Sequence, residues 1–157
     1  MSLWPASWRT SVPPPLVTLA AAAGMAWTSN EVPGWSSAWA FHQVIGLAIG
    51  LTATWWMLLA LWTMLSHRTT FNPLSPAQAQ HLVTEGVFAR SRNPIYLADM
   101  LLLLGWWWWL GEWTAGWGLL VFWGWMSALQ IPAEEAALRV RFGQDFVTYC
   151  QQVRRWV

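Results

Sequence analysis

The chain alternates between long apolar stretches and short polar segments. A bilayer core about 30 Å thick is crossed by about 20 apolar residues in helical conformation. The last two apolar stretches are separated only by Gly111 and Glu112, so we expect them to form a helical hairpin that ends at Pro132, where helical hydrogen bonding is interrupted. The pattern predicts an all-α, polytopic membrane helix bundle in one domain over residues 1–157, with about four transmembrane helices at 15–28, 38–66, 95–111 and 113–131.

The first stretch, 15–28, is the shortest and follows three prolines. Arg9 precedes it, and residues 24–26 resemble a small-residue cleavage site, so a cleaved signal peptide is an alternative interpretation. Cleavage would leave the topology of the other three stretches unchanged.

Charged residues are scarce, and all the basic ones lie on one side of the predicted membrane. They make up 10% of the chain, against about 25% in typical soluble domains. All eight basic residues are arginines, and each falls before the first stretch, between the second and third, or after the fourth. The positive-inside bias therefore places both termini in the cytoplasm and the chain, as a multi-pass protein, in the inner (cytoplasmic) membrane. The net charge of +1 gives no reason to expect a nucleic-acid partner.

Tryptophans and the single cysteine add two expectations. Many of the 17 tryptophans border the opposite side, so the run 106–109 is interpreted as interfacial anchoring, with an aromatic ligand cage as the alternative. Cys150 has no second cysteine to pair with, and we expect no metal site.

The two cytoplasmic segments, 67–94 and 132–157, hold most of the polar sequence. Gly86 predicts a tight turn, and Pro94 opens the third helix at its first turn, a favoured position. Acids at 134 and 135 suit the start of another helix, which Gly143 is expected to end. The C-terminal residues 145–156 form an amphipathic helix that we expect to lie along the membrane surface.

Three short motifs in these segments occur in a recognisable order. They are Leu82-Val83-Thr84-x-Gly86, Ser91-Arg92-Asn93-Pro94-x-Tyr96, and Glu134-Glu135 followed by Leu138, Phe142-Gly143, Phe146, Tyr149 and Val153-Arg154-Arg155-Trp156. Over about 69–156 the chain closely resembles the isoprenylcysteine carboxyl methyltransferases and related phospholipid methyltransferases. This resemblance implies a small membrane enzyme that binds S-adenosyl-L-methionine at the cytoplasmic face. No glycine-rich Rossmann fingerprint is found in the sequence.

The resemblance also implies the site residues. The cofactor carries an amino group, a carboxylate, ribose hydroxyls and adenine, so carboxylates, an arginine fork and an aromatic ring are suitable partners. Adjacent helical residues point about 100° apart, so we expect only one of the two glutamates to face the cofactor. The expected catalytic residues are Arg92, Tyr96 and Arg154; the expected cofactor-binding residues are Arg92, Asn93, Pro94, Tyr96, Glu134, Glu135 and Tyr149.

The sequence departs from the family pattern at two positions. Asn93 stands where many members have histidine, and Ala98 stands where glycine is frequent. If close backbone approach to the cofactor needs that glycine, binding here is weaker.

Structural alternatives accompany several of these residues. Arg92 could serve topology alone, the glutamates could be plain helix-start acids, Tyr96 an interfacial anchor, and Tyr149 a packing residue of the C-terminal helix. Arg154 and Arg155 could bind either anionic headgroups or a substrate carboxylate. Asp99 lies inside the third span and should face protein or a wet cavity, whereas His42 is expected to cap or pack.

The predicted substrate is a lipophilic small molecule or lipid that enters from the bilayer, methylated at a carboxylate or an amine. The absence of lysine and the compact size indicate a bacterial member. Two other functions are alternatives. One is a non-catalytic four-helix module that binds membrane lipid or a partner protein; the other is a small transporter, which would need more intramembrane polar residues than Asp99.

Overall fold

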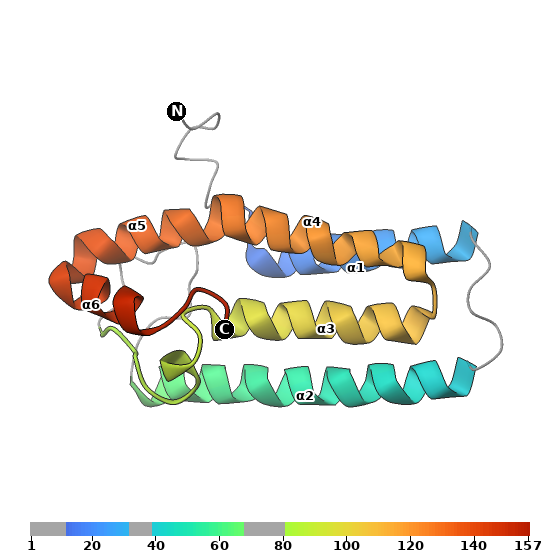
Figure 1. Cartoon of the computed structure of the whole chain (residues 1–157), viewed down its shortest axis with the longest axis horizontal. Helices are drawn as coiled ribbons and strands as arrows, with labels where there is room; N and C mark the ends of the chain where they lie inside the picture. The colour runs from blue at the N-terminus through green and yellow to red at the C-terminus, as the bar shows by residue number, and fades with distance from the viewer. Residues whose placement is uncertain (1–11, 32–38, 68–80) are drawn as a thin grey trace.

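The computed structural model describes residues 12–31, 39–67 and 81–157, and all regular structure in these ranges is helical. Figure 1 shows long helical runs lying alongside one another, with short helices and the C-terminus gathered at one end. The all-α prediction is confirmed. The elements are α1 (Pro14–Glu31), α2 (Trp39–Ser66), η3 (Gly86–Ala89), α3 (Pro94–Leu110), η4 (Trp113–Gly116), α4 (Trp117–Trp125), η5 (Met126–Gln130), α5 (Ile131–Phe142) and α6 (Gln144–Gln152).

Helices α2 and α3 pack with their backbones in close contact. A Cβ atom at Gly46 would lie 2.6 Å from the carbonyl oxygen of Gly105, and a Cβ atom at Gly105 would lie 2.8 Å from that of Gly46. Small residues at a helix interface permit this approach, as is common in membrane bundles. These two glycines therefore set the spacing of α2 and α3.

Helix α1 is part of the core of the bundle. Met25 is fully buried and Ala21 is 5% exposed, and both belong to the main apolar cluster. The indole of Trp106 donates a hydrogen bond of 3.1 Å to the carbonyl of Ala22. A side chain at Gly118 on α4 would collide with Met25, so this helix fits closely against its neighbours.

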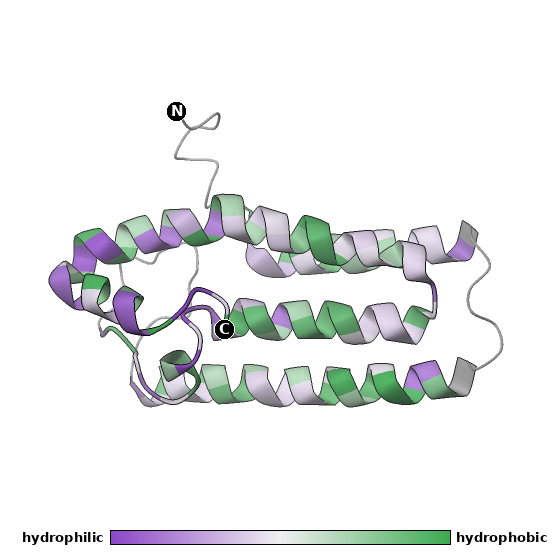
Figure 2. Ribbon diagram, viewed as in Figure 1, coloured by the Kyte–Doolittle hydropathy of each residue, from purple (hydrophilic) through white to green (hydrophobic). Residues whose placement is uncertain are grey.

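The predicted count of four spans is not confirmed. Among the described residues, one helix is long and apolar enough to cross a membrane, Phe41–Ser66, and the apolar helix Pro94–Leu110 is shorter. Helix α1 has 18 residues and α4 has nine, so both are shorter than α2, which has 28. Figure 2 shows apolar residues along the helical runs, and α2 exposes large apolar side chains, among them Leu51, Trp55 and Trp62.

The sequence predicted that the fourth helical run ends at Pro132, but the run continues through this residue. Residues 126–130 form a π-helical turn in which the Ile131 N–H donates to the Met126 carbonyl, and α5 follows directly with the proline in its first turn. Proline is tolerated there because the first N–H groups of a helix have no partner within that helix. The helical run therefore passes from α4 through η5 into α5, which carries both glutamates.

The C-terminal helix is shorter than predicted, and its apolar side faces protein. Helix α6 ends at Gln152, and Val153 is extended. Phe146, Tyr149 and Val153 are buried and pack with partly buried residues of α5 and of the loop before η3. This side is occupied by the chain itself, so it is not available to lie on the membrane surface. The predicted breaks are confirmed, with Gly86 and Gly143 at φ of 61° and 53°.

Candidate active site

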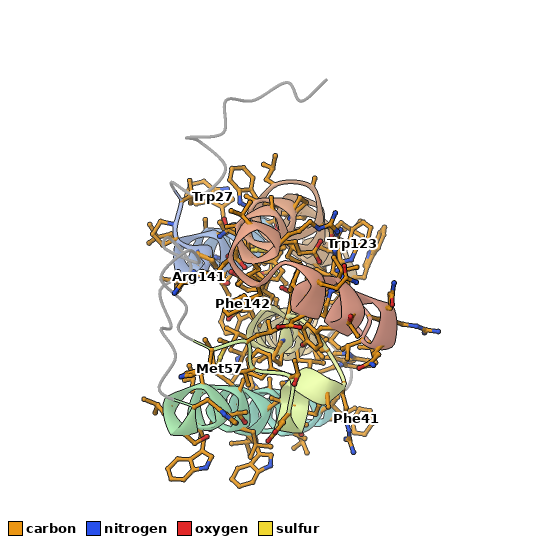
Figure 3. All side chains as sticks on the ribbon, turned by 90° about the vertical axis from the view of Figure 1, so that its left-hand side faces the viewer. Trp27, Phe41, Met57, Trp123, Arg141 and Phe142 are labelled. Atoms are coloured by element: carbon orange, nitrogen blue, oxygen red, sulfur yellow. The ribbon has the colours of Figure 1, made fainter. Side chains whose placement is uncertain are left out.

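One end of the bundle collects three segments that are distant in sequence. They are the loop leading into α3, the start of α5, and the extended segment that follows α6 (Figure 1). Figure 3 looks onto this end of the molecule. All the predicted site side chains except those of Pro94 and Arg154 take part in the contacts described below, and Arg154 contributes its backbone carbonyl.

The segment after α6 is tied to the start of α3 through its backbone. The Arg92 N–H donates to the Arg154 carbonyl at 3.0 Å, and the Asn93 side-chain amide donates to the Arg155 carbonyl at 2.9 Å. Ser91, 1% exposed, accepts a hydrogen bond from the Asn93 N–H at 3.1 Å. These bonds fix residues 153–156 beside the Arg-Asn-Pro motif.

Glu135 joins two arginines in a partly buried ion cluster. Arg92 Nη2 lies 2.8 Å from Glu135 Oε1, while Arg155 donates from Nε to Oε1 at 3.1 Å and from Nη2 to Oε2 at 2.6 Å. Burial by itself would raise the pKa of Glu135, but hydrogen bonds from Arg155 and Arg92 outweigh it and lower the pKa below 4.5. The same hydrogen bonds raise the pKa of Arg155. Glu135 is therefore ionised at neutral pH.

Arg92 also binds the end of α6. Its Nη1 donates to the carbonyls of Cys150 and Val153, at 3.1 and 2.7 Å. Its Nε is buried and has no hydrogen-bond partner among the described residues. One guanidinium thus joins α5 to α6 and still has a donor available.

Glu134 points to different partners from its neighbour. Its Oε1 accepts from the Tyr96 hydroxyl at 2.5 Å and from the Gln130 amide at 2.6 Å. Burial raises the pKa of Glu134 to about 7; the hydrogen bonds from Tyr96 and Gln130 lower it and the nearby Glu135 charge adds to the rise. The pKa values of the two glutamates are therefore shifted in opposite directions, and their side chains have different partners.

The other candidate residues from the sequence differ in how deeply they are buried. Pro94 is buried at the first turn of α3, and the hydroxyl of buried Tyr149 donates to the Phe88 carbonyl at 2.7 Å, which docks α6 on η3. The Arg154 side chain is exposed. Asp99, 8% exposed, faces the protein interior one turn beyond Tyr96.

Sequence reasoning omitted two participants from the predicted site. Gln130 is 1% exposed and lies one helical turn before Glu134, so a polar residue at the end of an apolar stretch was the available signal. Arg155 was considered beside Arg154 as a headgroup or carboxylate ligand, and it holds Glu135 through two hydrogen bonds. Only the folded chain shows which of the adjacent arginines turns inward.

The cluster has a donor set suited to a cofactor that carries both charges. Arg92 retains a buried Nε donor without a partner among the described residues, and Glu134 offers a carboxylate beside an aromatic ring. Among those residues no group of three His, Cys, Asp or Glu is placed to hold a metal ion. The residues present therefore fit an amino-acid-bearing organic cofactor such as S-adenosyl-L-methionine.

Comparison with known proteins identifies the family of the chain. The chain is 40% identical over 63 residues to an uncharacterized protein of Haemophilus influenzae; the match covers 40% of this chain and all of that protein. No solved structure matches the chain significantly. The phospholipid methyltransferase family matches residues 41–145, which include the Arg-Asn-Pro-x-Tyr motif and both glutamates and make up two thirds of the chain. The chain therefore belongs to the phospholipid methyltransferase family, a family of membrane methyltransferases.

Proposed function

We propose that the protein is an S-adenosyl-L-methionine-dependent methyltransferase, acting at the cytoplasmic face of the inner membrane on a lipophilic carboxylate or amine. The observation that supports this best is the meeting of Arg92, Tyr96, Glu134 and Glu135, from two separate motifs, in one hydrogen-bonded cluster. The proposal includes four membrane crossings with both termini in the cytoplasm, which would put this cluster on the arginine-rich side.

The cofactor supplies a methyl group bonded to a positively charged sulfur. Arg92 Nε is the proposed donor to its carboxylate, and Glu134 is the proposed acceptor for a ribose hydroxyl, which leaves this carboxylate able to take up a proton. Asn93 and Pro94 shape the backbone at the start of α3. Glu135 is the positioning residue, because both of its oxygens are already occupied by arginines.

Methyl transfer requires the nucleophile to lie in line with the methyl carbon and the leaving sulfur, so alignment is the protein's main task. Tyr96 contributes a buried ring and a hydroxyl at the junction of α3 and α5. Arg154, exposed beside the cluster, is the proposed ligand for an acidic or phosphorylated substrate. Tyr149 holds α6 in place through Phe88 and so supports the cofactor site indirectly.

Glu134 makes an amine substrate chemically suitable. A general base is most effective when its pKa lies near the working pH, and that of Glu134 is about 7. Such a carboxylate can accept the proton that an ammonium must lose before its nitrogen attacks. A carboxylate substrate would need no base and would pair with Arg154.

Binding of S-adenosylhomocysteine to the purified protein in micelles, followed by calorimetry, tests the cofactor site. We expect Arg92→Ala and Glu135→Gln to abolish binding while the helical circular dichroism is retained. Arg90→Ala is the matched control, because Arg90 is exposed two residues away. Unchanged binding in both site variants would refute the site assignment.

Incubation of membranes with methyl-labelled cofactor tests the reaction and its substrate class. Label in the lipid extract supports a lipid substrate, and alkaline release of that label as methanol identifies a methyl ester rather than a methylamine. A chain that binds no S-adenosylhomocysteine and transfers no label would instead behave as a non-catalytic membrane module.

A further inference from the structure

The opposite end of the bundle contains a small, partly open pocket. It lies where the start of α2, the end of α3 and the turn into α4 meet, away from the C-terminus (Figure 1). The void itself is about 20 Å³, and the hollow with its open mouth spans about 210 Å³. It shares no residue with the candidate active site. The pocket is lined by His42, Trp107, Trp108, Gly111, Glu112 and Trp113.

Aromatic rings held by specific contacts form most of the wall. His42 stacks on Trp108 with ring centroids 5.5 Å apart and an interplanar angle of 28°. Trp107 is tilted 59° to Trp108, and its indole N–H donates to the Glu112 carbonyl at 2.9 Å. The left-handed conformation of Gly111, with φ of 64°, turns the chain back so that Trp113 completes the wall. The rings of His42, Trp107 and Trp108 are therefore fixed by contacts within the chain before any ligand arrives.

Glu112 is a buried acid among the residues that line this pocket. The residue is 2% exposed, and its Oε1 accepts hydrogen bonds from the N–H and the hydroxyl of Thr114, at 3.1 and 3.0 Å. Its Oε2 is buried and has no hydrogen-bond partner among the described residues. An unpartnered oxygen of a buried acid is costly, and a positive charge nearby would offset that cost.

We propose that this pocket binds a quaternary ammonium group. The accessible surface of the pocket is apolar, which suits N-methyl groups, while the ring faces and the Glu112 carboxylate attract the positive charge. Hard metal ions need several oxygen ligands, and the lining side chains supply one carboxylate. A hydrated ammonium ion would lose its water without gaining hydrogen bonds from such a surface. The proposal is independent of the methyltransferase assignment.

Titration of the purified protein with choline, followed by saturation-transfer NMR of its methyl protons, tests the proposal. The neutral isostere 3,3-dimethylbutan-1-ol is the matched ligand, and we expect it to bind roughly tenfold more weakly, a factor that corresponds to about 1.4 kcal/mol. Equal binding of the two would overturn the charge argument. Absence of choline binding would overturn the proposal as a whole.

Two variants test the assigned residues. Glu112→Gln keeps an oxygen for Thr114 but removes the charge, and Trp113→Leu removes a ring that is 61% exposed, so both are expected to fold and to weaken choline binding roughly tenfold. Trp62→Leu is the control, since Trp62 is 71% exposed on α2 away from the pocket. An effect of Trp62→Leu equal to that of Trp113→Leu would overturn the assignment.

The ammonium group could belong to a free solute or to a lipid headgroup, and a lipid comparison distinguishes these sources. Choline binding is measured in nanodiscs of phosphatidylglycerol and of phosphatidylcholine. Loss of choline binding only in phosphatidylcholine supports a headgroup ligand, and equal binding in both supports a free solute. A signal in both lipids that Glu112→Gln and Trp113→Leu leave unchanged would overturn the proposal.

Discussion

The partly buried carboxyl of Glu134 makes the stability of the protein depend on pH. Its pKa rises from 4.5 to about 7 on folding. Between these values the folded protein binds the proton more tightly than the unfolded chain, so stability is full below about pH 4.5 and is lost as the pH rises through 7. The difference corresponds to about 3 kcal/mol at about 1.4 kcal/mol per pH unit.

Glu134→Gln removes this titration and preserves the shape of the side chain. Its carbonyl oxygen can still accept from Tyr96 and Gln130. In a chain of this length about 1 kcal/mol moves the thermal midpoint by about 2–4 °C. The midpoint of the variant minus that of the native protein should therefore increase by roughly 6–12 °C as the pH is raised from 4.5 to 8. Thermal unfolding in detergent, followed by circular dichroism, measures this change.

A matched acid separates Glu134 from general effects of charge. Asp145 is exposed in the first turn of α6, so the midpoint of Asp145→Asn relative to the native protein should stay nearly constant over the same pH interval. If the midpoint difference for Glu134→Gln is equally constant, the pKa of this carboxyl is not raised and its proposed role as a base loses its support.

Three further predictions concern packing and the ion cluster. Glu135→Gln leaves two arginines without their carboxylate, so trypsin should cleave the C-terminal segment several-fold faster, and an unchanged digestion rate would contradict the cluster. Gly46→Leu forces α2 away from α3 and should lower the thermal midpoint by several degrees. Gly50→Ala should leave the midpoint unchanged, because no atom lies within 4 Å of the new Cβ. Equal effects of the two substitutions would contradict the close packing. Tyr149→Phe removes the hydrogen bond to Phe88 and should cost about 1 kcal/mol of unfolding free energy, as measured by denaturant titration; no loss would show that this bond does not stabilise the fold.

Local signals allowed much of the fold to be predicted from the sequence. Apolar length gave the helical stretches, and Gly86, Pro94 and Gly143 gave the breaks between elements, because each acts through its own backbone. The continuation through Pro132 was missed because a π-helical turn depends on how the preceding residues pack. The sequence pattern of α6 was amphipathic, but that pattern does not distinguish lipid from protein as the partner of the apolar face.

The candidate site followed the same division between local and long-range information. Motif resemblance identified Arg92 and the two glutamates, and the structure brings them together. Adjacent residues on a helix point in different directions, so the sequence predicts that Glu134 and Glu135 have different environments. It does not predict which partners each glutamate has. The choice of Arg155 over Arg154 as the partner of Glu135 depends on the extended path of residues 153–156, which no local pattern specifies.

The docking of residues 153–156 on the start of α3 sets an order for biosynthesis. Asn93 and Arg155 are 62 residues apart. The ribosome therefore completes α3, α4 and α5 before it makes Arg155, whose carbonyl accepts the hydrogen bond from the Asn93 side chain. The nascent protein therefore reaches the membrane with Arg92 still lacking its C-terminal partners. The ion cluster closes only after synthesis has passed Arg155, so the site forms after the helices that carry Arg92 and Glu135 have been made.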